Sequence, residues 1–342
     1  GRAIKFVQYM PRKPIKHGIK VFALCDAETG YLLAFEVFTG EHAGGSTWDI
    51  IERLIIQSGL QNETGRRLFM DNYYTTMKVV TKLYEKHGWV CAGTVVQTKK
   101  KASKREKNDF PFTKITNGAR DLVDRGWSRR ATQTMKTSSG ATYIVQATIW
   151  KDKKIVGWLH TLAVGSEVVK ARRRIKGHRT AVKFDAPLVQ KKYAVGFNGV
   201  DLSDKDSAKY TTSLRTNRWY LRIFFWVIDR VVHSMYIIVC FLATDSFMPK
   251  WKKYKSKHNG RKKFQTHLGI ALMNKGIELD WKDPFDEEDK PKWMPQKKKN
   301  GKYHPCDCGI CFFCNIEMTN NICHGKVTAR PIVFFVLEIM RR

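Results

Sequence analysis

Acidic residues are scarce in this sequence: its 342 residues include 31 Asp and Glu against 62 Lys and Arg, which gives a formal net charge of +31. A charge excess of this size destabilises a compact chain by self-repulsion unless a polyanion neutralises it. The composition therefore favours a polyanionic partner. Nucleic acid is the preferred candidate, and an anionic membrane surface is the weaker alternative.

An uninterrupted apolar run of membrane-spanning length is also lacking. The longest run, residues 223–243, contains Asp229, Arg230 and His233. Charged side chains are costly inside a bilayer. We therefore expect a core helix in this region and no membrane partner.

Signals of secretion, repetition and disorder are absent as well. No signal-peptide pattern opens the sequence, so an oxidising compartment is not indicated. A hydrophobic content of 43%, with ten Trp and nineteen Phe, excludes a disordered basic tail. We expect Cys25, Cys91 and Cys240, which lie in apolar runs, to be buried. The length suits two domains, or one large domain with an insertion.

Hydrophobic periodicity in the first hundred residues predicts alternating strands and helices. The expected elements, in order, are strands at 19–25 and 31–38, a helix at 47–58, a strand at 68–70, a helix at 75–87 and a strand at 89–96. The first two strands flank the turn sequence DAETG and predict a hairpin. This order is typical of an α/β protein with a mixed sheet covered by helices.

The remainder of the chain changes character several times. A polar basic stretch leads into the β-rich pieces TYIVQATIW and KIVGWLHTLAV, and a helical pattern then resumes from 200 to about 243. We therefore divide the chain into a core (first part, 1–96), a β-rich basic insertion (97–190), the final core helices (191–245), a basic and acidic linker (246–300) and a cysteine-rich module (301–330).

Carboxylates occur in two short stretches separated by most of the middle of the chain. RRLFMDNYYT holds Asp71 at the end of a buried strand, and YAVGFNGVDLSD holds Asp201 and Asp204 in the first turn of a helix. Carboxylates that converge from distant segments are what a magnesium-dependent phosphoryl-transfer site needs. The alternative is structural: Asp71 forms a turn and caps a helix, and the other two acids favour a helix dipole. From the residues alone, both interpretations stay open.

Basic runs occur at 99–107, 172–179 and 250–263, and the last is interleaved with Trp251 and Tyr254. This composition is typical of binding to a nucleic-acid backbone, and solvated loops are the alternative. Side chains of this kind make good phosphate contacts. The residues that we expect to contact DNA are Arg215, Asn217, Arg218, Trp219, Lys252 and Lys253.

Cysteines cluster near the end of the chain in the pattern C-x-C-x2-C-x2-C, followed after eight residues by Cys-His. Thiolates and imidazoles at this density predict zinc. The candidate ligands are Cys306, Cys308, Cys311, Cys314, Cys323 and His324. With His304 they number seven, so one complete zinc site is expected and a second is doubtful. A reduced, metal-free cluster is the alternative.

Taken together, these motifs resemble the piggyBac transposase family and its domesticated derivatives. The segments that carry the resemblance are GRAIKFVQYMPRKPIKHGIK, CDAETGYLLAFEVFTG, MDNYYT, VCAGTV, TIWKDKKIV, GFNGVDLSDK and TNRWYLRIFFWVID. They follow one another in family order and cover about residues 1–245.

The resemblance implies a ribonuclease H-like fold in which three aspartates bind two divalent metal ions, Mg2+ or Mn2+. The second aspartate falls on Asp71 and the third on Asp201, with Asp204 as a further acid. The first lies on a strand that precedes Gly1. We therefore expect the sheet to lack its central first strand, the two-metal site to be incomplete, and the chain to be inactive by itself. Asp26 is better explained as a turn former than as a substitute.

The resemblance also implies an ancestral activity: metal-dependent cleavage at transposon ends, then strand transfer to TTAA targets through a hairpin intermediate. Trp219 matches a family tryptophan near the active site, where it stacks on a base or packs against the helix. Double-stranded DNA is the implied partner, a homodimer on DNA is allowed, and the nucleus is the expected location. In the family the cysteine-rich domain binds two zinc ions. A non-catalytic DNA-binding protein is the alternative function, and a basic membrane-surface protein is a third class.

Overall fold

The structure is a computed structural model that describes residues 7–10, 16–40, 45–95, 124–175, 177, 179–213, 216, 218–244, 246, 248–256, 259–278 and 331–339. The chain divides into two compact units. The first comprises Gly1–Arg230 and Val327–Arg342, and the second comprises Val231–Lys326. Each unit is described by itself.

The first unit begins with the predicted hairpin. Strands β2 (His17–Asp26) and β3 (Leu32–Val37) are antiparallel. The turn between them requires the left-handed conformation at Gly30, where φ is 72°. The carboxylate of Asp26 accepts hydrogen bonds from the backbone N and the hydroxyl of Thr29, at 2.9 and 2.5 Å. Asp26 is therefore a turn former, as its position in the sequence indicates.

Two amphipathic helices and two parallel strands follow. The elements are α2 (Thr47–Gln57), β4 (Arg67–Met70), α3 (Met77–His87) and β5 (Val90–Val95). Ser46 and Asp49 form a capping box at the start of α2. Gly88 ends α3 in the left-handed conformation. These local signals act where the sequence pattern predicts them, and the predicted mixed sheet with covering helices is confirmed.

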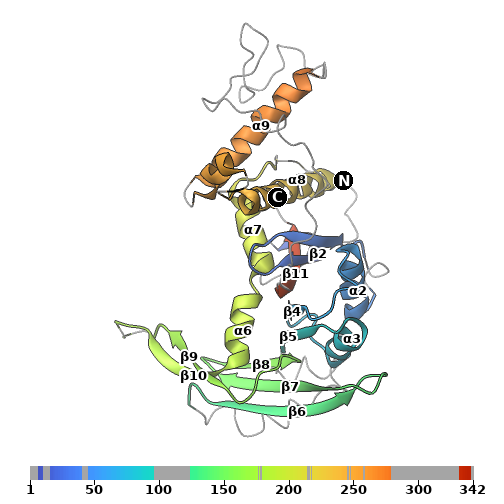
Figure 1. Cartoon of the computed structure of the whole chain (residues 1–342), viewed down its shortest axis with the longest axis vertical. Coiled ribbons are helices and arrows are strands. Elements are labelled where there is room, and N and C mark those ends of the chain that lie inside the picture. Colours follow the sequence, from blue (N-terminus) through green and yellow to red (C-terminus); the bar gives the residue numbers. More distant parts are fainter. Residues whose placement is uncertain are drawn as a thin grey trace. The chain divides into compact units, whose positions relative to one another are not determined.

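Within the described residues the main sheet has nine strands in the order β1-β2-β11-β4-β5-β8-β7-β6, and β3 pairs with β2 (Figure 1). The short β1 is Gln8–Tyr9. The central strand β11 is Pro331–Ile339, from near the end of the chain. It lies antiparallel to β2 and parallel to β4. The predicted absence of a central strand is therefore not what the structure shows, because a distant segment occupies that place.

The β-rich segment predicted at 97–190 contributes to this sheet. The strands β6 (Ser128–Lys136), β7 (Thr142–Lys151) and β8 (Ile155–His160) continue it, because β8 pairs with β5. This pairing covers the edge of β5, whose backbone groups otherwise lack partners on that side. Strands β9 (Val168–Arg173) and β10 (Val182–Pro187) form a separate two-stranded ribbon. The segment thus extends the core and adds a ribbon to it.

Each face of the sheet carries its own hydrophobic core. Side chains of β4 alternate between them: Leu68 and Met70 pack against α2 and α3, whereas Phe69 packs on the opposite face. The opposite face is covered by α6 (Leu188–Gly196) and α7 (Gly199–Lys209). Figure 1 shows these two pairs of helices on opposite sides of the strands.

Helix α8 (Trp219–Leu242) runs from the first unit into the second. By length and composition it is apolar enough to cross a membrane, and 22% of its most apolar window is buried, which is weak evidence by itself. The polar residues that interrupt the run have protein partners. Asp229 accepts hydrogen bonds from Thr211 and Thr212. His233 contacts Arg261 at 2.5 Å.

The second unit contains a small core within the stretch predicted as a linker. A 3-10 helix, η1 (Pro249–Lys255), precedes α9 (Gly260–Glu278). Tyr254 and Phe264 are buried together with Val239 of α8. The apolar residues between the lysines of this stretch are therefore numerous enough to pack η1 against α9.

Candidate functional site

Asp71 follows directly on β4 and is held by the loop after it. Its carboxylate accepts a hydrogen bond from the backbone N of Tyr73 at 2.8 Å. Its carbonyl oxygen accepts one from the Thr75 hydroxyl at 2.7 Å. Thr75 in turn lies against Gly93 of β5, where a Cβ would come within 1.9 Å of the threonine hydroxyl. The MDNYYT motif therefore fixes the carboxylate on a rigid strand end.

Asp201 lies in the first turn of α7, which is exposed at this residue. Glycines place the helix unusually close to the sheet. A Cβ at Gly196 would lie 2.3 Å from the Phe69 ring, and one at Gly199 would lie 2.6 Å from the carbonyl oxygen of Asp26. The glycines of GFNGVDLSD are therefore needed for α6 and α7 to seat on β2 and β4.

Tyr193 of α6 links the two segments. Its hydroxyl donates a hydrogen bond to the Met70 carbonyl at 2.9 Å, one residue before Asp71. Burial raises the pKa of Tyr193 to about 12, a hydrogen bond with Thr94 opposes the rise, and the charges of Asp71 and Asp201 add to it. Both carboxylates therefore lie near the same phenol, on the α6–α7 face of the sheet. The fold therefore places two acids that are far apart in the sequence near one tyrosine.

Asp204 has a different environment from Asp201. It forms an ion pair with Arg230, a buried residue of α8. The Arg230 guanidinium also donates to the Ser203 hydroxyl at 2.7 Å and lies 5.0 Å from the centre of the Trp226 ring. Asp204 thus joins α7 to α8, which is a structural role that the sequence pattern does not distinguish from metal binding.

The described part of the chain holds no group of three or more His, Cys, Asp or Glu side chains arranged to bind a metal ion. Two carboxylates can contribute to one hard cation, but a two-metal centre needs more oxygen ligands than these. The predicted zinc ligands, Cys306, Cys308, Cys311, Cys314, Cys323 and His324, lie outside the described residues, as do Arg215 and Asn217.

The other residues predicted to contact DNA lie on the surface of their own units. Arg218 is exposed just before α8, and Trp219, the first residue of that helix, is 38% exposed. In the second unit, Lys252 is exposed on η1, and the Lys253 ammonium lies 5.2 Å from the centre of the Tyr254 ring. These positions are accessible to a polyanion within each unit.

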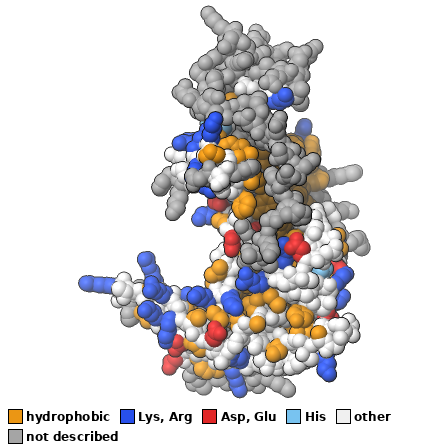
Figure 2. All heavy atoms as spheres, viewed as in Figure 1, with side chains coloured by type: hydrophobic (Ala, Val, Ile, Leu, Met, Phe, Trp, Pro, Cys, Tyr) orange, Lys and Arg blue, Asp and Glu red, His pale blue; other side chains and the backbone are white. Residues whose placement is uncertain are grey.

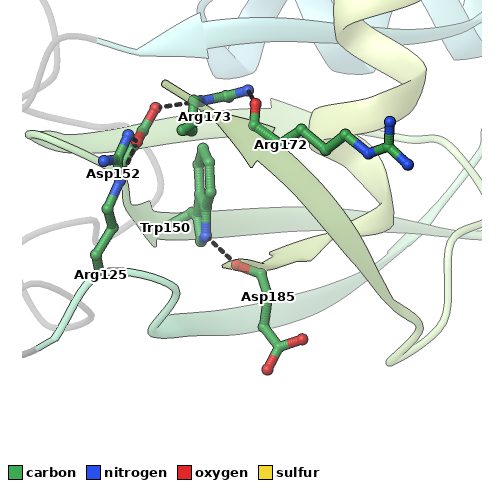
Figure 3. Close-up of polar contacts among 6 residues, drawn as sticks. All are labelled: Arg125, Trp150, Asp152, Arg172, Arg173 and Asp185. Atoms are coloured by element: carbon green, nitrogen blue, oxygen red, sulfur yellow. Dashed lines mark hydrogen bonds and ion pairs between the residues drawn. The ribbon is translucent and has the colours of Figure 1, made fainter. Parts of the chain in front are cut away.

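A braced ribbon is the feature that sequence reasoning missed. Figure 3 shows Asp152 between Arg125 and Arg173, with donor–acceptor distances of 2.7 and 2.9 Å from their Nε atoms. Trp150 donates its indole N–H to the carbonyl oxygen of Asp185, at 2.7 Å. These contacts hold β9 and β10 against β7. In the sequence, the single acid Asp152 among the lysines of KDKK was the signal that could have indicated this contact.

The ribbon presents basic side chains to solvent. The exposed ones are Lys170, Arg172, Arg174, Arg179 and Lys183. Lys170 pairs with Asp185 at 2.5 Å. Lys and Arg side chains gather where the ribbon lies, as Figure 2 shows in the same view as Figure 1. A cavity of about 270 Å3 beside it is lined by Arg129 and Arg130.

The first unit is an α/β fold with a mixed sheet that carries a hydrophobic core on each face. The sequence model of the family described as Transposase IS4 matches residues 2–233, more than half of the chain. The chain belongs to this transposase family, and the similarity of its fold to a piggyBac transposase agrees with the resemblance seen in the motifs.

One solved structure is similar to this one: the piggyBac transposase synaptic complex with hairpin DNA, determined by cryo-electron microscopy. The TM-score is 0.57 and the sequence identity is 19%. The match covers 87% of this chain but only 56% of the transposase chain, so this chain spans little more than half of that protein's length. A search of curated proteins gave no match.

Proposed function

We propose that this chain is a transposase-derived DNA-binding protein that keeps two carboxylates of an ancestral metal centre and does not cleave DNA by itself. The observation that carries the proposal is the convergence of Asp71 and Asp201 on Tyr193. Transposase family membership supplies the context. The strand order of the sheet supports the ribonuclease H-like character of the ancestor.

The ancestral chemistry would use these two side chains as rigid ligands. When bound, Mg2+ or Mn2+ activates a water or 3′-hydroxyl and stabilises the leaving oxygen of the phosphodiester. Asp71 is held at a strand end by Tyr73 and Thr75. Asp201 is held at a helix start by the glycine contacts. Both geometries suit metal ligands, but two carboxylates are too few for two cations.

Double-stranded DNA is the proposed partner, specifically transposon ends and TTAA targets. A net charge of +31 and the exposed bases of the ribbon support backbone binding. The similar transposase was solved with hairpin DNA. We further propose a nuclear location, one zinc ion on the Cys306–His324 cluster, and a homodimer on DNA as an arrangement to test.

The second candidate function is a DNA-binding protein in which no catalytic role is retained. The ion pair of Asp204 with Arg230 and the bracing of the ribbon by Asp152 favour it, because both use acids to stabilise the fold. The two candidates differ in one respect: only the first requires Asp71 and Asp201 to act together.

Paired assays on a duplex that ends in terminal repeats of a related element test the proposal. The full chain should bind this duplex with an affinity that falls steeply with salt, and should leave it uncut in Mn2+. A form extended upstream with a carboxylate-bearing strand should cleave it, and Asp71→Asn should abolish the cleavage. Binding that is insensitive to salt would overturn the DNA proposal. Cleavage by the unextended chain that Asp71→Asn abolishes would overturn its inactivity. Failure of the extended form to cleave would favour the second candidate.

A further inference from the structure

The β9–β10 ribbon has two unlike faces. Residues along each of its strands alternate between exposed and covered positions. The register places Lys183 opposite Arg172 and Asp185 opposite Lys170, so the exposed side chains of both strands share one face. Beyond Val168, the exposed residues of the two strands are all charged. This face, here called the outer face, comprises Lys170, Arg172, Lys183 and Asp185, together with Arg174, which follows β9.

The opposite face anchors the ribbon to the main sheet. Ala171 is buried in the core on the α6–α7 face. The Arg173 guanidinium lies 5.4 Å from the centre of the Trp150 ring and donates from Nε to Asp152 at 2.9 Å. The Trp150 indole donates to the carbonyl oxygen of Asp185 on the other strand at 2.7 Å. Both strands are therefore held in place by the fold, and a ligand of the outer face does not have to order them.

The dimensions of the outer face match one groove of duplex DNA. Neighbouring strands lie about 4.8 Å apart, and alternate residues of one strand are about 6.8 Å apart. The second spacing is close to two base-pair steps of about 3.4 Å. The major groove, about 12 Å wide, admits a two-stranded ribbon, whereas the minor groove, about 6 Å wide, does not.

The side chains of the outer face suit the base edges in that groove. Arg and Lys donate hydrogen bonds to the O6 and N7 acceptors of guanine, which lie in the major groove. Figure 3 shows the Arg172 guanidinium directed away from the Asp152 contacts. Figure 1 shows the far end of the ribbon projecting past the edge of the main sheet. Lys170 pairs with Asp185 at 2.5 Å, so Arg172, Arg174 and Lys183 carry the excess charge of this face.

We propose that the β9–β10 ribbon binds in the major groove of duplex DNA, with its outer face toward the base edges. The inference takes its partner from the proposed function and adds the groove and the residues that enter it. Contact with the phosphate backbone alone would need only positive charge, whereas entry into the groove needs the narrow, anchored ribbon. A-form RNA is excluded as an equivalent partner, because its major groove is too deep and narrow for side chains to read.

Blocking the major groove without changing the phosphates tests the proposal. The terminal-repeat duplex is prepared twice, once with cytosine and once with glucosylated 5-hydroxymethylcytosine, whose sugar projects into the major groove. Fluorescence anisotropy should show that the full chain binds the glucosylated duplex about tenfold more weakly than the plain one. Arg172→Ala combined with Lys183→Ala should bind the plain duplex more weakly and should distinguish the two duplexes by less than about twofold.

Matched controls separate groove entry from charge. Lys78→Ala combined with Lys86→Ala removes two exposed bases of α3 and should keep the full preference for the plain duplex. Distamycin, which fills the minor groove, should not displace the chain, and duplex RNA of equal length should compete poorly. Equal binding of the plain and glucosylated duplexes by the unaltered chain would overturn groove entry while DNA binding stands. A preference that survives in the ribbon variant, displacement by distamycin, or equal competition by RNA would overturn it as well. Failure to bind either duplex would instead overturn the proposed function, and the inference with it.

Discussion

Two acid-centred clusters in the first unit are built in opposite ways. Asp152 lies between the guanidinium groups of Arg125 and Arg173 and joins the ribbon to the sheet. Asp71 and Asp201 both lie near the Tyr193 phenol, so two negative charges act on the same side chain. An acid paired with arginine is already neutralised and serves the fold. Two acids placed near each other are an arrangement that a cation would stabilise. The contrast teaches that sequence position alone does not distinguish an acid that stabilises the fold from one that is a candidate metal ligand.

The packing of α6 on the sheet, which positions Tyr193 between the two acids, gives the largest expected effect. Gly196→Ala should lower the free energy of unfolding by about 1–3 kcal/mol, because its Cβ would overlap the Phe69 ring. Urea unfolding measures the change. Gly165→Ala is the control, since a Cβ at Gly165 meets nothing within 4 Å. An equal loss in both variants would contradict the proposed close approach of α6 to β4.

Removing the acid from the other cluster should also destabilise the fold. Asp152→Asn should cost about 1–3 kcal/mol, because it weakens hydrogen bonds from two arginines. Asp185→Asn is the control: its side chain pairs with Lys170, both are more than half exposed, and the expected cost is about 0–1 kcal/mol. Chemical unfolding of both variants compares them. If Asp185→Asn cost as much, the Asp152 bracing would not be the main support of the ribbon.

The Asp152 cluster also predicts a pH dependence. Burial acts to raise the pKa of Asp152, but hydrogen bonds and charges from Arg173 and Arg125 outweigh it and lower that pKa. A lowered pKa in the folded state contributes stability above the unfolded-state pKa, about 3.9, and loses it as pH falls further. The stability difference between the wild type and Asp152→Asn should therefore shrink below about pH 4. A difference that persists unchanged under acid conditions would contradict this assignment.

We expect the exposed basic side chains of the ribbon to contribute to DNA binding and not to the stability of the fold. Replacing Arg172 and Lys183 by Ala should weaken duplex binding and lower the slope of log K against log salt by about 2, since each neutralises about one phosphate. Fluorescence anisotropy at several salt concentrations measures this. The control replaces Lys78 and Lys86 of α3, also exposed. Similar slopes in both double variants would indicate diffuse charge attraction rather than contact through the ribbon.

The smallest expected effect concerns the phenol between the acids. Tyr193→Phe should lower the free energy of unfolding by about 0.5–1.5 kcal/mol, because the Met70 carbonyl loses a hydrogen bond. Tyr220→Phe, at a residue that is 50% exposed, should change it little. Thermal unfolding compares the two. If the loss were absent, Tyr193 would not be what couples α6 to the end of β4.

Much of the core could be predicted because its signals are local. Ser46 with Asp49 and the glycine after His87 mark helix ends, and alternation along β4 marks two buried faces. The placement of Asp71 at a strand end followed from the apolar run before it. The role of Asp204 could not be predicted in the same way, because its partner Arg230 is 26 residues away and lies on another helix.

By itself the sequence determined the family, the basic character and the local elements, since motifs, charge and periodicity are properties of neighbouring residues. Tertiary structure alone decided that residues 331–339 pair between β2 and β4, that β8 extends the sheet from β5, and that Asp71 and Asp201 both lie near Tyr193. The physical reason is that the side-chain pattern of a strand indicates which of its faces are buried but not which other strand it pairs with. Backbone hydrogen bonding is the same for every residue, so long-range pairing is settled only when the whole sheet is assembled.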